Sequence, residues 1–131
     1  MTTTIKPAVA GAELWAKKDY GKTYRSAGEG LMQKPIIQLV EQSGVVEAVQ
    51  AGRRVDVWDN ACGTGSVTAK FVAAVRDLPN TNWSVIGTDF SESMIESAKE
   101  RAQEESWLNV EIRVADAQVS KELNFECTAQ R

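Results

Sequence analysis

The chain has 131 residues, 43% of them hydrophobic and 25% charged, a composition typical of one globular domain. A net charge of -3 argues against a nucleic-acid partner, and the absence of an apolar run approaching about 20 residues argues against a membrane-spanning protein. With two cysteines and no histidine, we expect a cytoplasmic protein without a structural disulfide or a metal site.

The N-terminal part of the chain predicts a flexible leader followed by a helical cap. Residues 1–12 are rich in Thr, Ala and Gly, and 13–24 form a mixed segment that Gly21 interrupts. Leu31–Gln42 has the apolar spacing of a helix, and 45–50 add a short helical turn.

From residue 53 onward the sequence predicts strands and helices in alternation. The predicted elements are a strand over 53–58, a helix over 66–78, a strand over 83–89, a helix from the N-cap Ser91 to Glu104, and a strand over 109–114. Short joints between such elements are typical of parallel βαβ units. We therefore predict an α/β fold in which the helical cap, residues 1–52, precedes a partial Rossmann-like domain, residues 53–131, with three βα units.

The first strand breaks into a loop of small residues, Asp59-Asn60-Ala61-Cys62-Gly63-Thr64-Gly65, and a helix follows at once. Gly63 and Gly65 leave the backbone unshielded, so the carboxylate or ribose of a ligand can approach main-chain N–H groups. A tight turn without a ligand is an equal alternative. A further alternative is a fragment of a nucleotide-binding oxidoreductase, although the spacing of the glycines matches neither the G-x-G-x-x-G motif nor a Walker loop.

Two carboxylates follow the next two strands, at the same predicted edge of the sheet. Asp89 is placed to accept hydrogen bonds from both hydroxyls of a ribose, or to serve as a turn residue before the next helix. Asp116 is placed to accept from the amine of adenine beside Ala117, or simply to begin a loop. Phe90 and Met94 either flank the adenine or pack in the core.

Together these segments resemble the class I S-adenosylmethionine-dependent methyltransferases. Residues 59–65 are similar to the family's D-x-G-x-G-x-G loop, Gly87-Thr88-Asp89-Phe90-Ser91 with Met94 to its second motif, and Val114-Ala115-Asp116-Ala117 to its third. Leu123-Asn124-Phe125 is similar to the Leu-Pro-Phe that often follows. The resemblance covers roughly residues 55–125, and the small-molecule enzymes of ubiquinone-type or fungal secondary-metabolite pathways are the most similar.

The resemblance implies S-adenosyl-L-methionine as the cofactor, with its methionine portion at Asp59 and the glycine loop, its ribose at Asp89 and its adenine amine at Asp116. The implied cofactor-binding residues are Asp59, Ala61, Gly63, Gly65, Asp89, Phe90, Asp116 and Ala117. Tyr20 or Tyr24 would reach the cofactor from the N-terminal arm. Ala61 replaces the family's first glycine, a mild change provided that φ is negative there. The sequence identifies no catalytic base.

The family's sheet has seven strands with the first in its middle, and the sequence resembles only the N-terminal half. We therefore expect a truncated methyltransferase for a secondary-metabolite or quinone-like acceptor, with impaired activity of its own. The alternative is a non-catalytic partner or regulatory subunit of a complete methyltransferase. The exposed edge of the first strand predicts a homo- or hetero-oligomer in either case.

Overall fold

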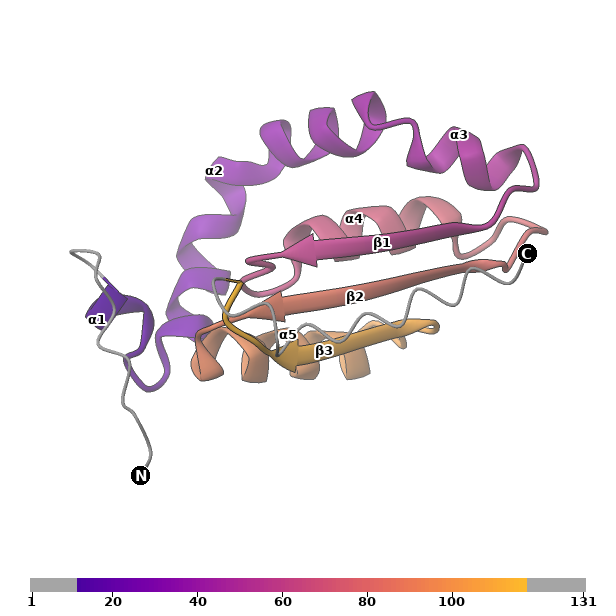
Figure 1. Ribbon diagram of the computed structural model, residues 1–131. Coiled ribbons are helices and arrows are strands. Elements are labelled where there is room, and N and C mark those ends of the chain that lie inside the picture. The colour runs from indigo at the N-terminus through magenta and orange to yellow at the C-terminus, as the bar shows by residue number, and fades with distance from the viewer. Residues whose placement is uncertain (1–11, 118–131) are drawn as a thin grey trace.

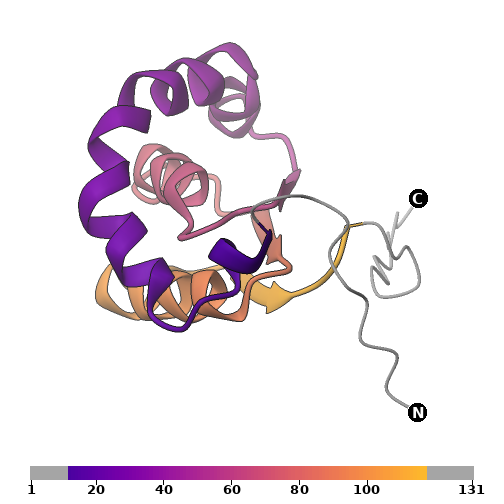
Figure 2. The same cartoon turned by 90° about the vertical axis from the view of Figure 1, so that its left-hand side faces the viewer.

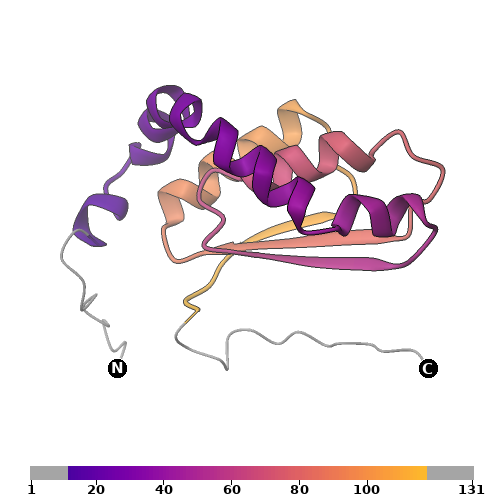
Figure 3. The same cartoon turned by 90° about the horizontal axis from the view of Figure 1, so that it is seen from above.

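The computed structural model describes residues 12–117 and contains a three-stranded parallel sheet, with helices packed against one of its faces (Figures 1 and 3). The strands β1 (Val55–Asn60), β2 (Trp83–Asp89) and β3 (Val110–Val114) lie in the order β1-β2-β3. Both pairs are parallel, so all three carboxyl ends lie at the same edge of the sheet.

Two helices connect the strands, α4 (Ser66–Val75) after β1 and α5 (Glu92–Glu104) after β2. This confirms the α/β class with parallel βα units. β1 begins and ends two residues later than predicted, and α4 ends three residues earlier.

The core between the sheet and the helices has two clusters. One is made by Val49, Phe71, Val72, Val75, Trp83 and Val85. In it the rings of Phe71 and Trp83 meet edge to face, with their centroids 5.6 Å apart. The other is made by Cys62, Ile95, Ala98 and Ile112. The first cluster packs the second half of α4 against the beginning of β2, and the second packs α5 against the glycine loop and β3.

Three helices precede the sheet: α1 (Ala12–Trp15), α2 (Tyr20–Gln42) and α3 (Val45–Gln50). The prediction that Gly21 interrupts this region is wrong, because Gly21 is the second residue of α2. Its N–H donates to Ser93 Oγ at 2.9 Å, and a Cβ at this position would lie 2.4 Å from the Ser93 carbonyl oxygen. Glycine therefore lets α2 approach α5 closely.

Helix α2 lies against both α5 and α4 and places the N-terminal cap beside the carboxyl ends of the strands (Figure 2). Only Gly21 and Val40 are buried in this helix. Its attachment to α5 is polar, through ion pairs of Lys22 with Glu100, Arg25 with Glu104 and Glu29 with Arg101. Between residues 12 and 117 the structure has no helix long and apolar enough to cross a membrane.

Candidate functional site

A cavity of about 340 Å³ lies at the carboxyl ends of β1 and β2 and is bordered by the N-terminal cap. Its volume falls within the roughly 300–1,000 Å³ of small-molecule sites. The cap contributes Trp15, Tyr24, Glu29, Met32 and Ile36. The remaining lining residues are Asp59, Ala61, Cys62, Gly63, Thr64, Ser66, Val67, Asp89, Phe90 and Met94. The cavity therefore brings together the cap, the glycine loop and the end of β2.

The loop between β1 and α4 turns sharply through three residues with positive φ, Ala61 at 56°, Gly63 at 55° and Gly65 at 82°. The condition under which Ala61 would be a mild replacement, a negative φ, is not met, so this residue sits in a conformation that favours glycine. Gly63 faces open space, since a Cβ there would meet no atom within 4 Å. A ligand can thus approach the backbone at Gly63 closely, although the N–H of this residue is donated to Asp89.

Asp89 fastens this loop to β2. Its Oδ2 accepts a hydrogen bond from the Gly63 N–H at 2.9 Å, and its Oδ1 accepts one from the Ser91 N–H at 2.9 Å. The side chain is buried but lines the cavity. Because each carboxylate oxygen has two acceptor sites, both oxygens retain capacity for a further donor such as a hydroxyl.

Asp59 lies at the end of β1, where its Oδ2 accepts a hydrogen bond from the Thr68 hydroxyl at 2.6 Å. Burial raises the pKa of Asp59 above its ordinary value, and the bonds from Thr68 offset this only in part. Burial likewise raises the pKa of the free Cys62 thiol. Within residues 12–117 no group of three or more acidic, cysteine or histidine side chains is arranged to hold a metal ion.

The structure does not bring every expected cofactor residue to this cavity. Gly65 faces the core, since a Cβ there would lie 2.9 Å from the Trp107 ring. Asp116 and Ala117 follow β3 and are absent from the described lining. The residue before them, Ala115, lies beside the site, because its N–H donates to the Asp89 carbonyl at 3.0 Å. Their contact with adenine stays a prediction.

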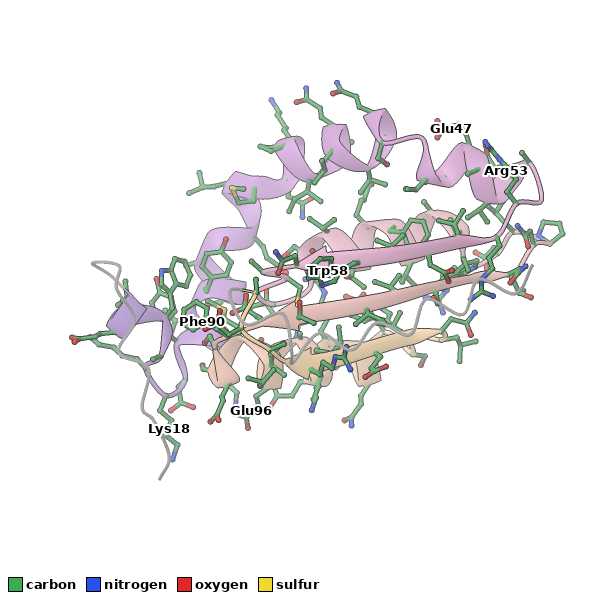
Figure 4. All side chains as sticks on the ribbon, viewed as in Figure 1. Lys18, Glu47, Arg53, Trp58, Phe90 and Glu96 are labelled. Atoms are coloured by element: carbon green, nitrogen blue, oxygen red, sulfur yellow. The ribbon has the colours of Figure 1, made fainter. Side chains whose placement is uncertain are left out.

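Of the two tyrosines expected near the cofactor, only Tyr24 lines the cavity. Tyr20 packs against Trp15, with the ring centroids 5.3 Å apart. Phe90 lies at the end of the sheet where α1 and α2 begin, whereas Arg53 lies at the opposite end (Figure 4). The carboxyl end of the sheet thus carries the aromatic side chains of the site.

Glu29 is the lining residue that sequence reasoning missed most clearly. It lies within α2 and accepts hydrogen bonds from Ser66 Oγ at 3.2 Å and from Arg101. No local pattern marks it, because its partners lie 37 and 72 residues away. The tertiary packing of α2 against α4 and α5 brings this carboxylate to the site.

Comparison with known proteins gives consistent matches. A family model described as "Methyltransferase domain" matches residues 57–128, more than half of the chain. Methyltransferase ktnA of Aspergillus niger is 39% identical over 82 residues, which are 62% of this chain and 26% of that protein. Acetylaranotin bis-thiomethyltransferase of Aspergillus terreus is 31% identical over 109 residues, 82% of this chain and 38% of that protein. The chain thus spans well under half the length of these relatives.

A solved structure also has a similar fold. It is a candidate S-adenosyl-L-methionine-dependent methyltransferase from Methanococcus maripaludis, with a TM-score of 0.51 and 17% identity. The match covers 76% of this chain and 43% of that one.

Proposed function

The chain belongs to the class I S-adenosylmethionine-dependent methyltransferases, and we propose that the cavity at the carboxyl ends of β1 and β2 binds S-adenosyl-L-methionine. The observation that carries this proposal is the 2.9 Å hydrogen bond from the Gly63 N–H to the Asp89 carboxylate in the cavity wall. It joins a glycine loop without a shielding side chain, just before a helix N-terminus, to an acid at the end of the next strand, the pair that a nucleoside ligand needs.

We assign each part of the cofactor to a group of residues. Asp59, Ala61 and Gly63 are assigned to the methionine portion, whose carboxylate is favoured by the positive end of the α4 dipole. Asp89 is assigned to the ribose hydroxyls, because both its oxygens keep acceptor capacity. Phe90 is assigned to the adenine side, toward the end of β3 where Asp116 and Ala117 follow.

We further propose a small-molecule acceptor of the secondary-metabolite or quinone-like class. When bound, the cofactor supplies a methyl group on a positively charged sulfur, ready for in-line displacement. Trp15, Tyr24, Met32 and Ile36 of the cap line the same cavity and offer an apolar, partly aromatic surface for such an acceptor. One relative carries the name acetylaranotin bis-thiomethyltransferase, which is consistent with this class.

A second candidate function is that of a partner subunit in a larger methyltransferase assembly. Within the described part of the chain β1 pairs only with β2, which leaves its other edge able to accept a strand. A complex with a second methyltransferase-like chain, detected by light scattering, would favour this function.

Calorimetric titration of the chain with S-adenosylhomocysteine tests the cofactor site. We expect Asp89→Asn to weaken binding by about 1–3 kcal/mol, because an amide replaces an acceptor that the ribose hydroxyls need. Asp77→Asn, an exposed substitution just after α4, is the matched control and should bind like the natural chain. Failure of the natural chain to bind, equal affinity of the Asp89 variant, or binding of NAD in place of S-adenosylhomocysteine would contradict the proposal.

A further inference from the structure

Strand β3 forms one border of the sheet, and among the described strands only β2 lies beside it (Figure 1). The Asn109 carbonyl accepts a hydrogen bond from the Val85 N–H at 2.9 Å, and the Ala115 N–H donates to the Asp89 carbonyl at 3.0 Å. Because backbone groups alternate in direction along a strand, residues 109, 111, 113 and 115 face β2. The N–H and C=O groups of residues 110, 112 and 114 therefore point away from β2, where a further strand can pair with them.

The five residues of β3, Val110-Glu111-Ile112-Arg113-Val114, form a pattern that has the same character in both directions. A valine stands at each end, an isoleucine stands at the centre, and the two residues between them carry opposite charges. When two copies of this strand lie antiparallel about a twofold axis at Ile112, every residue faces a complementary one. The strand is therefore complementary to itself, as an interface with twofold symmetry requires.

The charged residues of β3 lie on the face of the sheet opposite the helices. Ile112 packs against α5, so its neighbours Glu111 and Arg113 project from the other face, where they form an ion pair at 3.5 Å. In the antiparallel arrangement Glu111 lies opposite Arg113 of the second copy. The edge-directed groups of β3 make this a pair without direct backbone hydrogen bonds, the kind in which facing side chains approach most closely. Two ion pairs thus form across the interface and join those within each strand.

The apolar residues of β3 match on the helix-covered face. Ile112 lies opposite Ile112 of the second copy, and Val110 lies opposite Val114. These are the pairs that exchange backbone hydrogen bonds, because their N–H and C=O groups point to the open edge. Val114 is 48% exposed although it is apolar, and Val110 of the second copy would cover it. Pairs of β-branched side chains facing each other across strands stabilise a sheet.

The charges also select the register of this pairing. Moving the twofold axis by one residue keeps the backbone groups in step but places Glu111 opposite Glu111, or Arg113 opposite Arg113, of the second copy. Like charges directly opposite each other destabilise a pair of strands. The axis at Ile112 is the one for which charge, apolar contact and backbone pairing agree.

We propose that the chain forms a homodimer by antiparallel pairing of β3 with β3 of a second copy, which joins the two three-stranded sheets into one. In each copy β1 stays at the far border of the joined sheet. The interface uses none of the residues that line the cofactor cavity, so this inference is independent of the proposed function.

Analytical ultracentrifugation of the natural chain over a series of concentrations tests the dimer without any variant. We expect the mass to rise to twice that of one chain and no further. In hydrogen exchange followed by NMR, the amide protons of Val110, Ile112 and Val114 should exchange more slowly as the dimer forms. A chain that stays monomeric at millimolar concentration, or exchange at these three residues that does not change with concentration, overturns the proposal.

Charge reversal on β3 identifies the interface. Glu111→Arg or Arg113→Glu alone should weaken the homodimer at least roughly tenfold, because two attractive contacts across the axis become repulsive. An equal mixture of the two single variants should dimerise again, since every facing pair then carries opposite charges. The double variant with both substitutions should also dimerise, for the same reason. Recovery in the mixture shows in addition that each single variant is folded.

Asp77→Arg, a charge reversal at an exposed residue just after α4, is the matched control and should dimerise like the natural chain. A dimer that both single variants leave intact lies at another surface, such as the open edge of β1, and overturns the proposal. So does a mixture of the two folded single variants that stays monomeric, since folding is checked by circular dichroism of each variant.

Discussion

At the scale of single residues, Ala61 carries backbone strain in the wall of the cavity. Its φ of 56° is costly for a residue with a Cβ, by about 1–2 kcal/mol, and glycine removes that cost. Glycine also has greater freedom in the unfolded chain, which offsets about 0.4–1 kcal/mol of the gain. Ala61→Gly should therefore raise the free energy of unfolding by up to about 1.6 kcal/mol, measured by urea denaturation.

A second alanine-to-glycine substitution, at a residue without backbone strain, shows whether the gain at Ala61 comes from relief of strain or from glycine itself. Ala73 lies exposed in α4, and Ala73→Gly should lower stability by about 1 kcal/mol because glycine is a poor helix former. A loss of stability in both variants would mean that Ala61 is not strained.

Asp59 gives the site a predictable dependence on pH. Because its pKa is raised in the folded state, mainly by burial, the folded chain holds this proton at pH values where the unfolded chain has lost it. Ionisation of Asp59 in the folded chain therefore lowers the free energy of unfolding as pH rises above 3.8, the ordinary pKa of this carboxyl group. The stability gained by Asp59→Asn should grow with pH through that window, in urea denaturation at a series of pH values.

Asp56 provides a control of opposite sign. The Ser84 hydroxyl and Arg54 lower the pKa of Asp56, so its negative charge stabilises the fold. The stability that Asp56→Asn loses relative to the natural chain should therefore grow as pH rises. A gain from Asp59→Asn that is the same at every pH would contradict the burial of a charge at this position.

Gly63 and Asp89 at the strand ends were predictable from sequence, whereas the cap residues other than Tyr24 were not. Gly63 and Asp89 follow apolar strands directly, so local patterns locate them and the parallel order of the strands brings them together. The positive φ of Ala61 depends on how the loop closes onto β2 through the Cys62 N–H and the Thr88 carbonyl, 2.9 Å apart. Glu29 depends on helix packing, for which its own sequence neighbourhood contains no signal.

At the scale of elements, Gly21 sets how closely α2 approaches α5. A methyl group there would collide with the Ser93 carbonyl, so Gly21→Ala should lower the free energy of unfolding by about 1–3 kcal/mol, as overpacking does. Gly30→Ala, in the same helix with nothing within 4 Å of the added Cβ, should instead raise it by about 1 kcal/mol. Thermal denaturation of both variants gives the comparison, and a stabilising Gly21→Ala would show that the two helices are not in close contact.

The elements that sequence predicted best are those with strong local signals. The boundaries of β2 were predicted to the residue, and Ser91 caps α5 as expected, accepting from the Met94 N–H at 3.3 Å. Helix α2 was missed over its first turns because Gly21, Gly28 and Gly30 are poor helix formers. Contacts with α5 stabilise those turns, and a single-sequence pattern contains no record of such contacts.

At the scale of the whole molecule, the fold separates two ends of the sheet with different roles. The carboxyl ends of the strands meet the glycine loop and the cap, while Arg53 and Glu47 lie at the opposite end (Figure 4). Because the strands are parallel, every strand-end residue of the site lies on one side of the molecule. Ligand binding should therefore perturb one end of the sheet and leave the other unchanged.

The most direct test of the cofactor site is an amide NMR spectrum of the chain recorded with and without S-adenosyl-L-methionine. We expect the largest shifts at Gly63, Thr64 and Phe90, with small ones at Arg53 and Asn82. Shifts concentrated at Arg53 and Asn82, or no shifts at a saturating concentration, would contradict the site.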